Sequence, residues 1–343
     1  MMYGMGDWEL RGMNMNQMRS RTTAMLAAAL FLAAGKQATG QSPTPTIASY
    51  LSSARTAAGM EWAGTMLRLC IPPLPAPVRS AGPPREAPAR ETWHAEPVKV
   101  ADNLYFLGTR GYSSWAIVGR EGIILIEAAF DYSVKDEIVE GMKKLGLNIA
   151  DVKYLILSHA HADHDGGAKF LQDSIDGVHL LYGAEDWDLI EKTPTHAGGK
   201  PKRDKTADDG MVVSVGDASV RVVTMPGHTA GTLSYLFEVR DNGKPMRVAY
   251  VGGTAIPFNG TAEFYDRYIA SSRKMEAAAK QYGATALISN HSEFDDAFFK
   301  AQVARNRASG EPNPFDVGAD GVARYFKVIQ DCATAARIRA TGK

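Results

Sequence analysis

Residues 158–167 constrain the fold of this chain more than any other stretch, because they read Ser-His-Ala-His-Ala-Asp-His-Asp-Gly-Gly. Three imidazoles and a carboxylate, at His159, His161, Asp163 and His164, directly follow the apolar run at 154–157. On an α-helix His159 and His161 would point about 200° apart, whereas residues i and i+2 of an extended segment point the same way. The spacing therefore predicts a strand end followed by a loop, whose side chains bind metal ions such as Zn²⁺. The alternative is a histidine-rich surface loop.

Two further histidines follow apolar runs in the second half of the chain. His228 lies in Met-Pro-Gly-His-Thr-Ala-Gly at 225–231, where proline and glycine indicate a tight turn. His291 lies in Ile-Ser-Asn-His-Ser at 288–292. Neither histidine alone would indicate a metal site. With the cluster they complete the donors that two zinc ions need: three imidazoles for one ion, and a carboxylate with two imidazoles for the other.

The order of predicted strands and helices indicates a layered α/β body. Short apolar runs punctuated by glycine and asparagine predict strands at 98–100, 104–107, 114–118, 123–126, 153–158 and 178–182, and helices at 131–144, 167–172 and 184–192. A polar stretch at 193–210 predicts a long loop. Strands then follow at 212–215, 220–225, 234–239, 247–251 and 286–289, with helices at 266–281, 295–307 and 317–337. Two halves of similar order predict an α/β sandwich.

The N-terminal region has a different character. Arginines precede an apolar stretch at 24–34, and small residues suit a cleavage before Gln41, so we expect a targeting segment and an exported protein, periplasmic or secreted. An uncleaved anchor or a buried helix is the alternative. The expected parts of the chain are a targeting segment at 1–40, a helical arm at 41–71, a proline-rich connector at 72–92 and a catalytic domain at 93–343.

The charge balance argues against one class of partner. Lys+Arg and Asp+Glu number 38 each, so the net charge gives no electrostatic reason to expect a nucleic-acid partner. Beyond residue 40 no apolar run reaches the roughly 18 residues that span a bilayer, so we expect no membrane segment once the targeting segment is removed. The two cysteines, Cys70 and Cys332, either form one disulfide that closes a long loop or remain two buried thiols.

These motifs resemble those of the metallo-β-lactamase-fold hydrolases, and in particular the third zinc β-lactamase subclass. The resemblance covers residues 93–337 and is carried by Ser-His-Ala-His-Ala-Asp-His at 158–164, Gly-His-Thr at 227–229, the segment 242–250 and His291. It implies an αββα sandwich built from two similar halves. It also implies that the first zinc is bound by His159, His161 and His228, and the second by Asp163, His164 and His291.

The stretch after the strand at 247–251 bears on which relatives this chain resembles. In most relatives outside the β-lactamases an aspartate there bridges the metals, and another lactamase subclass has a cysteine. Residues 251–254 read Val-Gly-Gly-Thr, with neither, which matches the third subclass. Serines that contact the substrate carboxylate in that subclass are replaced by Gly253 and Ala255, which leaves Thr254 as a candidate replacement.

Four other residues carry expectations about support and substrate contact. The family's common aspartate after the strand at 123–126 is Glu127 here, which keeps the charge with a longer reach. Tyr112 and Trp115 are expected either to overhang the site or to lie in the core. Asn290 is expected either to orient the substrate or to cap a turn.

The donor set and the resemblance predict a dizinc hydrolase that opens a β-lactam or similar cyclic amide in a small-molecule substrate, using a metal-bound hydroxide. Asp163 and His161 are the candidate catalytic residues, since Asp163 is expected to orient the hydroxide and His161 to hold the first zinc. A hydrolase of the same fold acting on lactones, esters, thioesters or phosphoesters is the alternative, favoured by the missing serines. A non-catalytic zinc-binding protein is the third reading.

Overall fold

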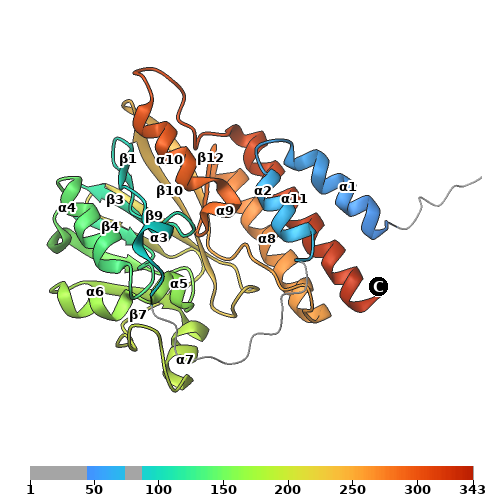
Figure 1. The fold of residues 1–343 in the computed structure, drawn as a ribbon, viewed down its shortest axis with the longest axis horizontal. Coiled ribbons are helices and arrows are strands. Elements are labelled where there is room, and N and C mark those ends of the chain that lie inside the picture. Colours follow the sequence, from blue (N-terminus) through green and yellow to red (C-terminus); the bar gives the residue numbers. More distant parts are fainter. Residues whose placement is uncertain (1–44, 74–86, 343) are drawn as a thin grey trace, which may run out of the picture. The chain divides into compact units, whose positions relative to one another are not determined.

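The computed structural model describes residues 45–73 and 87–342 of the chain, and Figure 1 shows their fold. Pro45–Lys343 form one compact unit. The expected targeting segment at 1–40 and most of the expected proline-rich connector lie outside the described residues. Among the helices within the described ranges, none is both long enough and apolar enough to span a bilayer.

Seven strands form the first sheet, in the order in which they occur in the chain. They are β1 (Val98–Ala101), β2 (Leu104–Phe106), β3 (Trp115–Gly119), β4 (Gly122–Ile126), β5 (Val152–Ile156), β6 (His179–Gly183) and β7 (Lys205–Ala207). Strands β1 to β4 pair antiparallel and β4 to β7 pair parallel. The Ile-Ile-Leu-Ile run of β4 is buried at every position, as expected for a parallel strand that is covered on both faces.

Five strands form the second sheet, in the order β12-β11-β10-β9-β8. They are β8 (Val212–Val215), β9 (Ala218–Thr224), β10 (Leu233–Asp241), β11 (Lys244–Val251) and β12 (Ala286–Ser289). Neighbours pair antiparallel except β11 and β12, which are parallel. Each half of the body from residue 93 onward thus builds one sheet, as the repeated order of elements predicts.

Helices cover both sheets. They are α1 (Ile47–Ala58), α2 (Ala63–Cys70), α3 (Arg90–Trp93), α4 (Glu140–Lys144), α5 (Ala162–Asp165), α6 (Ala168–Ser174), α7 (Ala184–Lys192), α8 (Ala262–Tyr282), α9 (Ser292–Asp295), α10 (Ala297–Asn306) and α11 (Gly318–Thr341). A π-helical turn, η1 (Lys135–Val139), precedes α4, and a 3₁₀ turn, η2 (Ile149–Asp151), precedes β5.

Three layers of buried side chains hold this arrangement together. Phe106 and Trp115 of the first sheet pack with Phe237 of the second in the layer between the sheets. The outer face of the first sheet packs against residues of η1, α4, α6 and α7, and the outer face of the second packs against α8 and α11. Figure 1 shows α4 and α6 on one side of the strands and α8 and α11 on the other. The predicted αββα sandwich is confirmed.

The expected helical arm consists of two helices that pack on α11. Trp62, between α1 and α2, donates from Nε1 to the carbonyl of Gly321 at 2.9 Å, and its ring lies 5.1 Å from that of Tyr325. Cys70 of α2 and Cys332 of α11 form a disulfide across 262 residues of sequence. Of the two alternatives for the cysteines, the disulfide is therefore the one that the structure contains.

The structure corrects three local predictions. Asp163 and His164 do not follow the strand in a loop, but lie on the single turn α5, because the carbonyl of His161 accepts from the backbone N–H groups of His164 and Asp165. The expected loop at 193–210 contains β7, which pairs with β6. The expected helix at 131–144 begins with the π-helical turn rather than an α-helix.

Candidate metal centre

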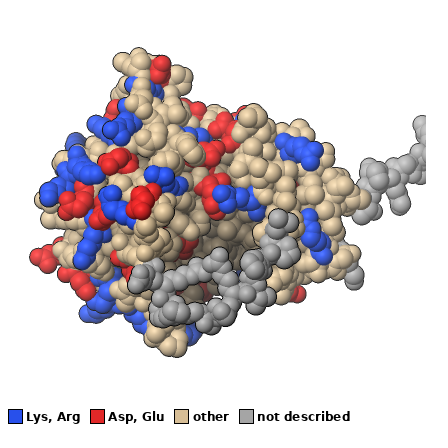
Figure 2. Space-filling view, viewed as in Figure 1, with Lys and Arg blue, Asp and Glu red and all other residues tan. Residues whose placement is uncertain are grey.

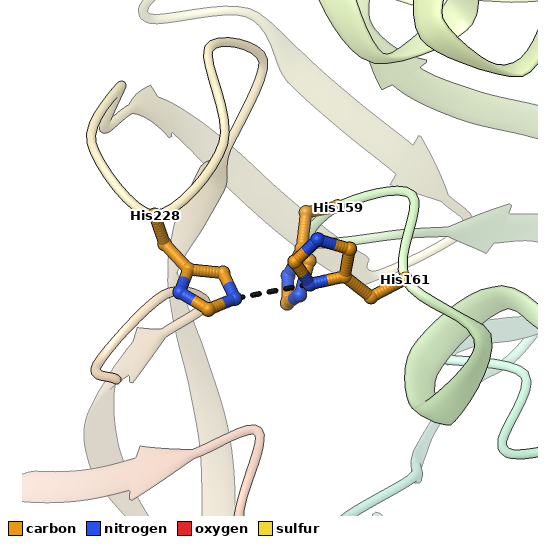
Figure 3. A group of neighbouring side chains, drawn as sticks. All are labelled: His159, His161 and His228. Carbon is orange, nitrogen blue, oxygen red and sulfur yellow. Dashed lines mark hydrogen bonds between the residues drawn. The ribbon is translucent and has the colours of Figure 1, made fainter. Parts of the chain in front are cut away.

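Three imidazoles from two loops converge beyond the carboxyl ends of β5 and β9 (Figure 3). His228 Nε2 lies 3.1 Å from His161 Nδ1, and the ligand atoms of His159, His161 and His228 all lie within 4.8 Å of one another. His159 is 1% exposed, and its Nε2 has no hydrogen-bond partner. A zinc tetrahedron with Zn–N distances of about 2.0–2.1 Å has edges of about 3.3 Å. This first set therefore fits one zinc ion.

Backbone carbonyls orient two of these rings. His159 Nδ1 donates to the carbonyl of Gly252 at 3.0 Å, and His228 Nδ1 donates to the carbonyl of Ala255 at 2.8 Å. A neutral ring that carries its proton on Nδ1 has its lone pair on Nε2. Both rings thus present the lone pair of Nε2 to a metal ion. The backbone carbonyls bind the other ring nitrogen, as is usual for metal-binding histidines.

A carboxylate and two further imidazoles form a second set beside the first. Asp163 Oδ2 lies 3.2 Å from His164 Nε2 and 3.5 Å from His291 Nε2, and these two nitrogens are 3.1 Å apart. The ring centroids of His159 and His164 are 4.5 Å apart, so the two sets adjoin. The six residues come from segments that follow β5, β9 and β12. The structure therefore brings together all the ligands expected from the sequence.

Burial controls the protonation of most of these groups. It is the largest cause that lowers the pKa of His159 and His161, and it lowers the pKa of His228 to about 4 and of His291 to about 3. The pKa of His164 is raised instead, because the hydrogen bond to Asp163 and the nearby carboxylates outweigh the effect of burial. Burial favours the neutral carboxyl of Asp163, but His164 and His291 lower its pKa. Most donors are thus deprotonated at neutral pH, as metal ligands must be.

Asp186, near the start of α7, connects the two loops that carry the first set. Its Oδ2 accepts from the backbone N–H of Ala160 at 3.0 Å and from the hydroxyl of Thr229 at 2.9 Å. Its Oδ1 accepts from the backbone N–H of Gly231 at 3.2 Å. The side chain is 1% exposed. One buried carboxylate therefore fixes the segment of His159 and His161 against the turn of His228.

Glu127 supports the second set from behind. It is buried, it accepts from the backbone N–H of Ser158 at 3.3 Å, and the hydroxyl of Tyr250 donates to it. Its Oε2 lies 4.0 Å from His164 Nδ1, a buried atom without a hydrogen-bond partner. Burial raises the pKa of Glu127 to about 7. The position agrees with the supporting role expected for this residue.

Comparison with known proteins identifies a family domain in part of the chain. Residues 107–241 match the model of the metallo-beta-lactamase superfamily. The chain contains a metallo-beta-lactamase superfamily domain. A probable metallo-hydrolase of Burkholderia pseudomallei is 28% identical over 160 residues, which is 40% of this chain and 52% of the relative. A hydroxyacylglutathione hydrolase of Rhodopseudomonas palustris is 25% identical over 213 residues, 58% of this chain and 76% of the relative.

A solved structure with the same architecture is a subclass B3 metallo-beta-lactamase of Bradyrhizobium japonicum. It aligns with a TM-score of 0.59 at 28% identity, and the alignment covers 68% of this chain and 91% of that one. The chain spans about half the length of the Burkholderia relative. The superfamily resemblance noted in the sequence is confirmed.

The other three residues with expected roles in support or substrate contact lie in different surroundings. Tyr112 lies at the site, with its ring 4.9 Å from that of His291. Trp115 is fully buried on β3 against Phe106 and Phe315, so it belongs to the core. Asn290 is 1% exposed, and its Nδ2 donates to the carbonyl of Gly252 at 2.8 Å and lies 3.3 Å from His164 Nε2, so it is buried beside the second set.

The side chain of Thr254 does not point toward the candidate metal ligands. Its hydroxyl is buried and lies 2.7 Å from the hydroxyl of Tyr325 and 3.1 Å from that of Ser289. Both contacts lie on the side of β12 and α11. Thr254 therefore does not replace the missing serines, and the sequence hypothesis that it replaces them is wrong.

Sequence reasoning missed two residues of the domain's site. Asp186 is one, since nothing in its local sequence shows that it accepts bonds from residues 26 and 45 positions away. His196 is the other, because its Nε2 lies 2.9 Å from Oδ2 of Asp165, directly after the ligand His164. A histidine in an otherwise polar loop beside Gly198 and Gly199 was the only available signal.

Proposed function

We propose that this protein is a dizinc hydrolase that opens a β-lactam or a similar cyclic amide. One observation carries the proposal: six donors from three separate segments converge as two adjacent sets, with distances of 3.1–3.5 Å between neighbouring donor atoms where the structure gives them. The first set has three imidazoles, and the second has a carboxylate and two imidazoles. Such sets suit two zinc ions.

Two zinc ions held there would polarise a substrate carbonyl and lower the pKa of a water molecule toward neutrality. The residues of the chain set the rest of the chemistry. Asp163 stays ionised because His164 and His291 lower its pKa, so its carboxylate can accept a hydrogen bond from the attacking water and hold it in place. His159 and His164 are buried whereas His161 is exposed, so a substrate reaches the donors from the side of His161.

A hydrolase of lactones, esters or thioesters is the second candidate. The side chains after β11 favour it. The hydroxyl of Thr254 is buried, and Gly253 and Ala255 have no hydroxyl, so residues 253–255 offer none to bind a β-lactam carboxylate. Hydroxyacylglutathione hydrolases among the curated relatives support the same candidate.

The test is turnover by the zinc-loaded protein of a β-lactam panel and of a lactone and thioester panel. His161→Ala removes an exposed ligand of the first set, and His179→Ala is the matched control, because His179 pairs with Asp204 outside both sets. β-Lactam turnover that is lost in His161→Ala and kept in His179→Ala supports the first candidate. Turnover of lactones or thioesters alone supports the second, and two bound zinc ions without any turnover contradict both.

We further propose that the protein is exported. The disulfide between Cys70 and Cys332 supports this, because disulfides persist in oxidising compartments and are rare in the cytosol. Cell fractionation followed by alkylation of free thiols is the measurement. Protein recovered in the cytosolic fraction with both thiols free would contradict the proposal.

A further inference from the structure

Four aromatic rings form a continuous row beside the second set of donors. The ring centroids of Tyr112 and Phe130 are 4.9 Å apart, and those of Phe130 and Tyr132 are 4.8 Å apart with planes inclined by 18°. Trp93 continues the row at 5.5 Å from Tyr132. These spacings are typical of interacting aromatic pairs. We call these four residues the aromatic row.

The row begins at the metal ligands. The ring of Tyr112 lies 4.9 Å from that of His291 and 6.1 Å from that of His164. The backbone of Tyr112 pairs with His291 in an antiparallel bridge, and Ser113 N donates to the carbonyl of Asn290 at 2.9 Å. The near end of the row is thus fixed against the second set by main-chain hydrogen bonds.

Phe130, in the middle of the row, directly follows a loop with a strained backbone at 127–129. Glu127 and Ala129 have φ of 65° and 58°, a conformation that residues other than glycine seldom adopt. The loop is held by the N–H of Ala128, which donates to the carbonyl of His164 at 2.7 Å, and by the N–H of Gly167, which donates to the carbonyl of Ala129 at 3.1 Å. Strain of this kind persists where the surrounding structure enforces it, and it clusters at functional sites. It places Phe130 beside the metal-binding segment.

The rings of the row do not belong to the core. All four residues are partly exposed, whereas Trp115, which packs between the sheets, is fully buried. Burial raises the pKa of Tyr112 to about 12 and also raises that of Tyr132, and in both cases the negative charge of Asp163 adds to the effect. The two tyrosines therefore lie within electrostatic reach of the second set. Figure 2 shows that Lys and Arg are interspersed with Asp and Glu on the face it presents.

We propose that the aromatic row is a platform for the substrate, and that it binds a flat apolar or aromatic substituent next to the bond that is hydrolysed. The inference rests on the proposed hydrolytic function and narrows its substrate class to amides or esters with an aryl-bearing substituent. Partly exposed rings that start at the ligands offer stacking surface to such a group and offer little to a small polar one.

The test compares two substrates that share a scissile bond, namely a penicillin nucleus or a homoserine lactone that carries either a phenylacetyl or an acetyl group. We expect the zinc-loaded protein to favour the phenylacetyl compound by roughly fivefold to tenfold in kcat/KM, which corresponds to one aromatic pair. Phe130→Leu and Tyr132→Leu keep apolar volume but remove a ring, so each should reduce the preference to about twofold through KM, with kcat unchanged.

Two matched variants keep the test specific. Tyr132→Phe retains the ring and should retain the preference. Phe299→Ala removes a ring that is 68% exposed on α10, outside the row, and should also retain it. An equal preference in the wild type and in both leucine variants would overturn the platform while leaving the hydrolase proposal intact.

Binding provides a second readout that does not depend on turnover. Calorimetry of the zinc-loaded protein with N-phenylacetylglycine and N-acetylglycine should show tighter binding of the phenylacetyl compound, again lost in both leucine variants. If no substrate turns over but this difference is present, the platform stands and the proposed hydrolysis fails. If both compounds bind equally to the wild type, the platform is wrong.

Discussion

Replacement of Asp186 by asparagine tests whether this residue matters more for zinc affinity than for the stability of the fold. Asn has the shape of Asp, but one carboxylate oxygen becomes an NH₂ group that can only donate. In the wild type Oδ2 accepts from Ala160 N and the Thr229 hydroxyl, and Oδ1 accepts from Gly231 N. Whichever way the amide turns, its NH₂ faces at least one N–H donor. The change therefore disturbs one of the loops that carry the first set.

Two effects on the free energy of unfolding oppose each other. A buried donor left without its acceptor costs about 1–3 kcal/mol. Burial raises the pKa of Asp186 to about 6 from an ordinary value of 3.8, so keeping its charge in the folded protein costs about 3 kcal/mol at pH 7. Asn removes that cost. We therefore expect a net change within about 2 kcal/mol at pH 7.

The pH dependence follows from the sign of the same shift. A raised carboxyl pKa means that the folded state holds its proton more tightly, so this contribution to stability is complete below pH 3.8. It is lost as the pH rises through about 6. Asp186→Asn should remove this slope between pH 4 and 6. Urea unfolding of the metal-free protein at pH 4.5 and pH 7 measures it.

Metal affinity should change more than stability. Loss of an outer support usually weakens metal binding about 10–100-fold, and we expect this for the first of the two sets. Zinc competition with a chelator measures it, and Asp188→Asn is the control, because Asp188 lies on the same helix and pairs with Arg203 at the surface. A variant that loses more than about 4 kcal/mol of stability while it binds zinc as tightly as the wild type would refute the reasoning.

Three further predictions concern the disulfide, the glycine after β11 and the zinc count. The double variant Cys70→Ser, Cys332→Ser should lower the free energy of unfolding by about 2–5 kcal/mol, because the disulfide closes a loop of 262 residues. Urea titration measures this, and an unchanged unfolding midpoint would contradict the prediction. Gly252→Ala should prevent soluble folding or lower the melting temperature sharply, because its Cβ would lie 1.9 Å from the carbonyl oxygen of Leu233. His161→Ala and His291→Ala should each bind one zinc ion fewer than the wild type by elemental analysis, and His179→Ala should bind the same number.

The fold could be predicted from the sequence where burial shapes the pattern. The strands at the centre of the first sheet carry continuous apolar runs, and the element order of the two halves indicated two sheets. β7 was missed because Lys205 and Thr206 are exposed and the strand pairs with β6 alone, so it lacks an apolar pattern. The π-helical turn at Lys135–Val139 was missed because its sequence contains no residue that excludes an ordinary α-helix.

The convergence of the six candidate ligands was predictable because four of them lie within six consecutive residues and the other two follow apolar strands. The residues that position them were not, since their roles arise from contacts between distant segments. Asp186 becomes an acceptor for two loops only when β6, β5 and β9 are in place. Thr254 was a reasonable replacement for serine by position, but its hydroxyl packs against Tyr325, 71 residues away, and this direction is set by the packing of α11.

Packing also explains why position 252 places no side chain between the two sets. The carbonyl of Gly252 accepts from His159 of the first set at 3.0 Å and from Asn290, the neighbour of His291 in the second, at 2.8 Å. A Cβ at this position would lie 1.9 Å from the carbonyl oxygen of Leu233 and 2.5 Å from Cβ of Ser158. An aspartate at position 252 would therefore push apart the ends of β5, β10 and β11. The glycine lets the backbone itself connect the two sets of donors, which leaves the space between them free of any side chain from this position.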